Sequence, residues 1–131
     1  MGSSTEYLRI KDLSPNINAP FNLKAIVLEK QAPDKVEGTG NVLVADETGC
    51  VNVVVSGAIV NGLQYGDILR LKNTTKLMAS GNRLYVATNE VSRVGEFAML
   101  FKESHNMSRF IWAQDPSTSQ WSIASDSKAR K

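Results

Sequence analysis

Residues 42–63 read VLVADETGCVNVVVSGAIVNGL, and this stretch decides the fold. An apolar run over 42–45 and a β-branched run over 50–55 stand on either side of the sequence DETG. Aspartate tolerates left-handed backbone and glycine supplies positive φ, so DETG predicts a tight turn and the two runs predict an antiparallel hairpin. Residues 56–63 then predict a helix of about two turns, with Ser56 as its N-cap.

Apolar residues before the hairpin predict a further strand over residues 21–29. Leu23 and Val27 point to one side of that strand. Ile26 and Leu28 are apolar on the other side, so we expect this strand to be covered on both faces.

Two more strands follow the predicted helix. Leucines alternate with basic side chains over residues 68–77, and Leu84 and Val86 alternate with Arg83 and Tyr85. The count is five or six short strands, and one short helix lies between the third and the fourth. That order is typical of the OB (oligonucleotide- and oligosaccharide-binding) fold. We therefore predict an all-β, five-stranded OB-fold barrel with one short helix between strands 3 and 4.

The strand pattern fails from Ser104 onward. Residues 116–131 are rich in serine and charge, a composition that does not form a core. We therefore expect an OB-fold domain over residues 1–103 and a flexible, disordered C-terminal tail over residues 104–131. Two interpretations are open for the apolar cluster at 110–112 (FIW): it anchors a partner, or it packs back onto the barrel.

Composition excludes several classes of site. The 131 residues include one cysteine and one histidine, which excludes an internal disulfide, a zinc site built from cysteine pairs and a multi-histidine metal site. Cys50 lies in a valine-rich strand and is expected to be a small buried hydrophobe, and His105 is expected at the surface. No glycine string matches a phosphate-binding or dinucleotide-binding loop. We therefore expect no catalytic residues, no cofactor, no metal and no small-molecule substrate.

Charge is nearly balanced along the chain. The net charge is +2, and the first 97 residues hold ten basic and ten acidic side chains. Any contact with nucleic acid must therefore come from a local surface rather than from the overall field. The apolar runs are far shorter than the ~20 residues of a membrane span, so we expect no membrane partner.

Four short motifs resemble a known family. They are IKDLSP at 10–15, LVADETG at 43–49, LQYGDILRL at 63–71 and VGEF at 94–97. In this order they resemble the simple, single-OB single-stranded DNA-binding proteins, best represented by the B subunit of SOSS, the sensor of single-stranded DNA complex. The resemblance covers residues 9 to about 101, with Tyr65 where the family usually has proline.

The resemblance implies a nuclear protein, with a cytoplasmic location also open, that binds single-stranded nucleic acid without catalysis. It further implies a subunit of a larger DNA-maintenance and DNA-repair complex. Three of the family's base-stacking aromatics fall on Ser56, Thr75 and Ala79, and only Tyr85 is kept. Each stacked base contributes ~1–3 kcal/mol, so we expect charge to dominate binding here.

The candidate nucleic-acid-binding residues are basic side chains opposite the leucines, one aromatic ring and two polar groups. They are Asn52, Ser56, Arg70, Lys72, Lys76, Arg83 and Tyr85. We expect the four basic residues to form one stripe with the tyrosine, which would bind phosphates with an affinity that falls as salt rises. The competing interpretation is that they are ordinary solvent-facing charges of a half-exposed sheet.

Glu96 and Phe97 are the candidate partner-binding residues. In the resembled family this stretch lies where a large scaffold subunit docks, and apolar residues follow it directly in this chain. Two other functions therefore stay open. One is an OB-fold protein-interaction subunit with weak or no intrinsic binding of nucleic acid, and the other is an RNA-binding OB protein.

Overall fold

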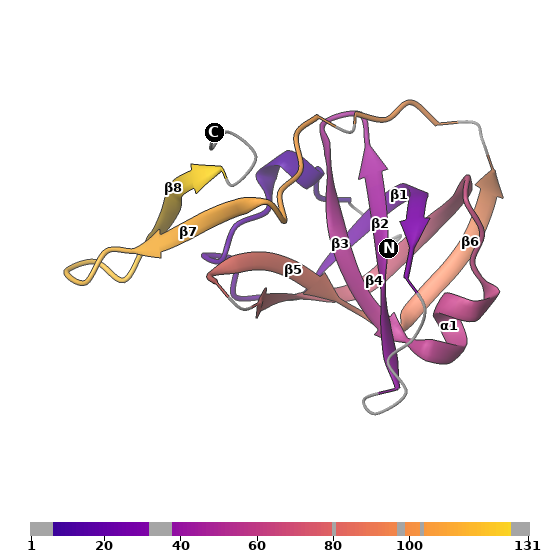
Figure 1. Ribbon diagram of the computed structural model, residues 1–131, viewed down its shortest axis with the longest axis horizontal. Helices are drawn as coiled ribbons and strands as arrows, with labels where there is room; N and C mark the ends of the chain where they lie inside the picture. Colours follow the sequence, from indigo (N-terminus) through magenta and orange to yellow (C-terminus); the bar gives the residue numbers. More distant parts are fainter. Residues whose placement is uncertain (1–6, 32–37, 80, 97–98, 103, 127–131) are drawn as a thin grey trace, which may run out of the picture.

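Five strands close a small barrel in the computed structural model, which describes residues 7–31, 38–79, 81–96, 99–102 and 104–126 (Figure 1). The neighbours around the barrel run β1-β2-β3-β5-β4 and back to β1, and only the β3–β5 pairing is parallel. The strands are β1 (Phe21–Lys30), β2 (Thr39–Asp46), β3 (Gly49–Ser56), β4 (Asp67–Ala79) and β5 (Arg83–Ala87). Helix α1 (Gly57–Gly62) joins β3 to β4, so the predicted OB-type barrel is confirmed.

Further elements extend the barrel. The short helix η1 (Ile10–Asp12) precedes it. Strand β6 (Glu90–Glu96) follows β5 and pairs with the first half of β4, residues 67–72. The hairpin of β7 (Phe110–Gln114) and β8 (Trp121–Asp126) continues the sheet beyond β5 and projects away from α1 (Figure 1).

Two apolar clusters hold these strands together. The first fills the barrel with alternate residues of every strand, including Leu23 and Val27 of β1. The second lies outside β1, where Ile26 and Leu28 pack with Cys50 and neighbouring residues. The prediction that β1 is covered on both faces is therefore confirmed, and Cys50 is buried as expected.

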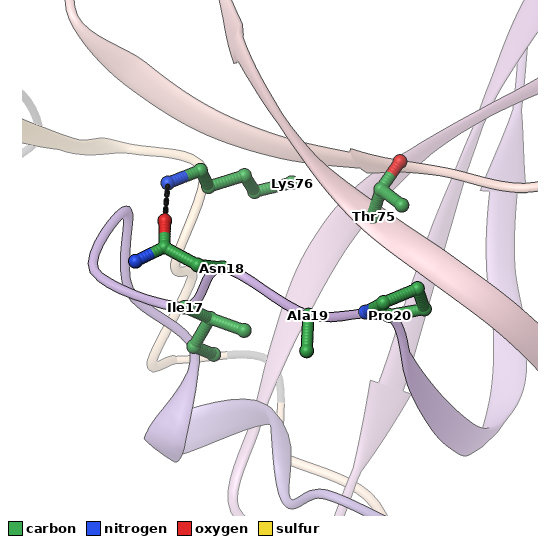
Figure 2. Close-up of a pocket in the computed structure, with 6 residues that line it drawn as sticks. All are labelled: Ile17, Asn18, Ala19, Pro20, Thr75 and Lys76. Atoms are coloured by element: carbon green, nitrogen blue, oxygen red, sulfur yellow. Dashed lines mark hydrogen bonds between the residues drawn. The ribbon is translucent and has the colours of Figure 1, made fainter.

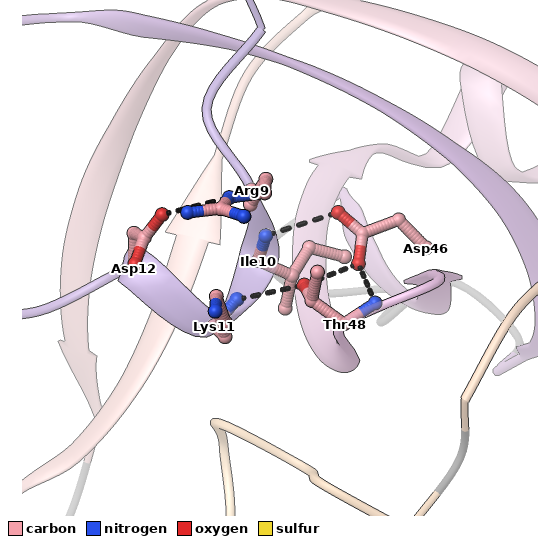
Figure 3. Close-up of polar contacts among 6 residues, drawn as sticks. All are labelled: Arg9, Ile10, Lys11, Asp12, Asp46 and Thr48. Carbon is pink, nitrogen blue, oxygen red and sulfur yellow. Dashed lines mark hydrogen bonds and ion pairs between the residues drawn. The ribbon is translucent and has the colours of Figure 1, made fainter.

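Two of the motifs found in the sequence contact each other (Figure 3). The buried carboxylate of Asp46 accepts hydrogen bonds from the Ile10 N–H at 3.0 Å and from the Thr48 N–H at 2.7 Å. The Thr48 hydroxyl donates to the same carboxylate and accepts from the Lys11 N–H at 3.1 Å. These bonds fasten η1 to the β2–β3 turn, which gives IKDL and DETG a shared structural role.

Gly49 is needed for a reason other than the one expected from the sequence. Gly49 does not have a positive φ. Among the described glycines, positive φ values occur at Gly38, Gly66 and Gly81. A Cβ at Gly49 would instead lie 2.5 Å from the backbone oxygen of His105, a distance that no side chain tolerates. The turn therefore requires glycine because another segment approaches closely, and the positive-φ expectation was wrong.

The expected flexible tail also needs correction. Met107, Phe110 and Trp112 are buried in the main core, and β7 and β8 lie within the range predicted to be disordered. The Ser108 hydroxyl donates to the Leu84 carbonyl and accepts from the Asn52 N–H, so it bridges β5 and β3 where these strands do not pair. Of the two interpretations of the cluster at 110–112, packing onto the barrel is the one observed.

Candidate nucleic-acid interface

One outer surface of the barrel collects most of the candidate residues. Alternate residues of β3, β5 and the second half of β4, residues 74–79, point outward there, because their neighbours in sequence fill the core. Val54 pairs with Ala87, and Leu77 pairs with Tyr85, so the three strands form one continuous surface. We name it the β3–β5 face and define it by Asn52, Val54, Ser56, Thr75, Leu77, Arg83, Tyr85 and Ala87.

Arg83 and Tyr85 stand next to each other on this face. They alternate with the buried residues Leu84 and Val86, and both are partly exposed. Among the ion pairs of the described residues, none involves Arg83. The face therefore offers an uncompensated cation beside an aromatic ring, a combination that suits a phosphate next to a base.

The predicted basic stripe is interrupted at Asn73. This residue has a φ of 50°, and the pairing of β1 with β4 shifts by one residue at the same place. Leu71 and Thr74 both point inward although they are three residues apart, which an unbroken strand does not allow. The expectation of a single stripe along β4 was therefore wrong.

Arg70 and Lys72 lie on the other side of this bulge. Arg70 pairs with Lys24 of β1 and with Ser92 of β6, and Lys72 pairs with Glu90. These two basic residues belong to the half of β4 that contacts β1 and β6, whereas Arg83 pairs with the end of the other half.

Lys76 is also separated from the β3–β5 face. It points to the side of β4 that carries Met78, and its ammonium group donates to the Pro15 carbonyl. It also donates to Oδ1 of Asn18 at 3.2 Å (Figure 2). The charge of Lys76 therefore holds the segment before β1 against the barrel. Its expected role in the stripe is replaced by a structural one.

Ser56 and Asn52 both lie on the β3–β5 face, as expected. The Ser56 hydroxyl accepts from the Ile59 N–H at 3.4 Å, which confirms the predicted N-cap of α1. The Ser56 N–H donates to Oδ1 of Asn89 at 3.0 Å, and the Asn52 N–H donates to Ser108. The backbone of β3 is thus fixed at both places, and the partly exposed side chain of Asn52 faces outward.

Two hollows meet at Thr75 beside this face. One has a volume of about 350 Å³ and is lined by residues of β2 to β5, such as Thr39 and Val54, and by Thr88 and Asn89 between β5 and β6. The other, of about 230 Å³, lies between Thr75 and the segment over residues 17–20 (Figure 2). Neither hollow was predicted from the sequence, because the residues that line each one are distant in the chain and, apart from Lys76, are uncharged.

The region proposed for partner binding contains a small ionic cluster. Arg93 of β6 donates to Asp67 and to Glu96, in each case at 2.8 Å. Burial acts to raise the pKa of Asp67, but hydrogen bonds from Arg93 and from the Gln64 N–H outweigh it and hold the pKa below its ordinary value. Glu96 therefore helps to fasten β6 to β4, and Phe97 lies outside the described residues.

The described ranges also bear on metal binding and on membrane-spanning helices. Within them, no group of three or more His, Cys, Asp or Glu side chains is placed to hold a metal ion. No helix found there has the length and apolar character needed to cross a membrane.

Comparison with known proteins supports the fold. No model of a known protein family matches the chain. The solution structure of a hypothetical protein from Arabidopsis thaliana is similar, with a TM-score of 0.68 and 19% sequence identity. The match covers 90% of this chain and 98% of that protein. At this identity the similarity indicates a shared fold and carries no function.

Proposed function

We propose that this protein binds single-stranded nucleic acid, DNA in the first instance, on the β3–β5 face. The observation that carries the proposal is the position of Arg83 beside Tyr85 on an outward surface of an OB-type barrel. OB folds bind oligonucleotides on a surface formed by strands 2 and 3 and by loops beside them, and the β3–β5 face includes strand 3 of that surface. Phosphates would contact Arg83, and a base would stack on Tyr85.

The proposed role is non-catalytic and belongs to a larger DNA-maintenance assembly in the nucleus. The family resemblance, through its VGEF motif at 94–97, supports a subunit rather than a protein that acts alone. With one aromatic on the face, charge contributes a large share of the affinity, and RNA is a substrate of the same chemical class.

A salt titration tests this proposal. Binding of fluorescent oligo-dT, oligo-rU and a DNA duplex is measured by anisotropy over a range of salt concentrations. We expect both single strands to bind more tightly than the duplex, with log affinity falling by about 0.7 per neutralised phosphate for each unit of log salt. Absence of binding to either single strand at low salt would contradict the proposal.

A second candidate function, a protein-interaction subunit, is favoured by a different observation. Leu100 is 81% exposed and Phe101 is 40% exposed, in a short segment that the Lys102 N–H fastens to the Asp46 carbonyl. Exposed apolar side chains held in place are typical of docking surfaces. If single strands do not bind, a Leu100→Ser, Phe101→Ser variant that loses a partner held by the wild type would support this function.

A further inference from the structure

The larger hollow beside the β3–β5 face has the chemistry of a site for one neutral, flat group. Among the described residues that line it, none is charged. Val54, Val55 and Ala87 form an apolar part of the wall, and asparagine and threonine residues form the rest. Such a wall does not favour the binding of a phosphate, because no cation lines it to compensate the phosphate charge.

Two asparagines of this wall each keep one hydrogen-bonding group available. Oδ1 of Asn89 accepts from the Ser56 N–H, and an N–H group only donates, so the orientation of this amide is fixed. Nδ2 of Asn73 donates to the carboxylate of Glu90, which fixes the second amide in the same way. The described part of the chain gives no partner to Nδ2 of Asn89 or to Oδ1 of Asn73.

The hollow therefore presents one donor, one acceptor and an apolar wall. Oδ1 of Asn41 is a further acceptor close by: it is buried without a partner in the described residues, and Asn41 pairs with Val54 of the wall. A nucleobase has a flat apolar face and an edge with adjacent donors and acceptors, so it matches all three features.

We infer that this hollow binds a single nucleobase of the strand by its hydrogen-bonding edge, an inference that rests on the function proposed above. The base would lie against Val54 and Ala87, with its edge between Asn73 and Asn89. Recognition would then combine two unlike contacts: phosphate and stacking at Arg83 and Tyr85, and hydrogen bonding to a base edge at the two asparagines.

The test compares a base-containing strand with a strand that lacks bases. The probes are oligo-dT of about ten nucleotides and an abasic strand of the same length, which has the same phosphates. Asn89→Asp keeps the acceptor for Ser56 but removes the donor, and Asn73→Gly removes the acceptor while tolerating the positive φ. Gln120→Glu adds the same charge in the turn between β7 and β8, which contributes no residue to the hollow.

The expected result is a change in the ratio of the two affinities. Loss of one neutral hydrogen bond should lower the preference for oligo-dT over the abasic strand roughly three- to tenfold in Asn89→Asp and in Asn73→Gly. General repulsion by the new charge cancels in this ratio, so Gln120→Glu should leave it unchanged. If Asn89→Asp fails to fold, Asn73→Gly and the side-chain amide signals of Asn73 and Asn89 in NMR spectra of the wild type decide the question.

The possible failures can be told apart. If the wild type binds oligo-dT but the ratio stays constant in both variants, and the two amide signals do not move, this inference is overturned and the proposed function stands. If the wild type binds neither strand, the proposed function and this inference fail together.

Discussion

The first half of β4, residues 67–72, and its second half, residues 74–79, belong to one strand but differ in their surroundings. The first half lies between β1 and β6, where Arg93 fastens Asp67. The second half pairs with β5, turns Thr75 and Leu77 outward, and buries the Thr74 hydroxyl without a partner among the described residues. One left-handed residue, Asn73, separates a half that is fastened by ion pairing from a half that borders the proposed binding surface.

The largest expected effect concerns where binding occurs. Arg83→Ala combined with Tyr85→Ala should weaken oligo-dT binding about a hundredfold, because it removes one stacking contact and one phosphate contact. The matched control is Arg70→Ala with Tyr65→Ala, which removes the same residue types away from the β3–β5 face. It should change the affinity less than about threefold. Equal losses in the two variants, measured by anisotropy, would contradict the proposal that the strand binds beside the second half of β4 rather than beside the first.

The next effect concerns the residue that separates the halves. Valine at position 73 is strained at a φ of 50°, so Asn73→Val should lower the free energy of unfolding by about 1–2 kcal/mol relative to Asn73→Gly. Chemical denaturation of both variants measures this difference. If valine proves as stable as glycine, the bulge does not depend on left-handed backbone.

A smaller effect, of opposite sign, is expected inside the second half. The Thr74 hydroxyl is buried and has no partner in the described part of the chain. Thr74→Val removes that hydroxyl at nearly constant shape and should raise the free energy of unfolding by about 1 kcal/mol. Thr88→Val is the control: its hydroxyl donates to the Lys72 carbonyl and accepts from the Glu90 N–H, so the same change should be destabilising. Destabilisation by Thr74→Val to the same extent would show that the Thr74 hydroxyl is satisfied.

The smallest effect concerns the ionic cluster of the first half. Asp67 has a folded-state pKa below its ordinary value of 3.8, so its stabilising effect is complete above about pH 4 and is lost as pH falls through the folded-state pKa. Asp67→Asn should cost about 0.5–1 kcal/mol at neutral pH, since the Arg93 side chain is half exposed and screened by water.

That cost should shrink as the medium is acidified below pH 4, because the wild type then loses the same interaction. Denaturation curves over an acid series measure it, with Asp12→Asn as the control at an exposed ion pair. A cost that persists unchanged at low pH would assign the effect to packing rather than to charge.

Sequence patterns predicted the elements whose signals are local. The hairpin around DETG, the N-cap at Ser56 and the two apolar sides of β1 each depend on residues close together in the chain, and each is observed. The alternation of residues 68–77 was misread beyond Asn73, because a single bulge reverses which residues point outward and alternation itself carries no sign of it.

The segment after Ser104 was missed for a different physical reason. Its order comes from contacts distant in sequence, such as the Cys50 N–H with the His105 carbonyl and the Ser108 hydroxyl between Leu84 and Asn52. Strand β7 pairs with β5 at a single position, Arg83 with Ile111, and periodicity within five residues is too short to reveal it. The larger hollow could not be predicted for the same reason, since four strands contribute to its wall.

An NMR titration distinguishes binding on the β3–β5 face from binding beside β1 and β6. Oligo-dT is added to the ¹⁵N-labelled protein, and the backbone amide shifts of the two halves of β4 and of β5 are followed. We expect the largest changes at Thr75, Leu77, Arg83 and Tyr85, with little change at Arg70. Changes centred on Arg70 and the strands beside it, with the β3–β5 face unaffected, would contradict it.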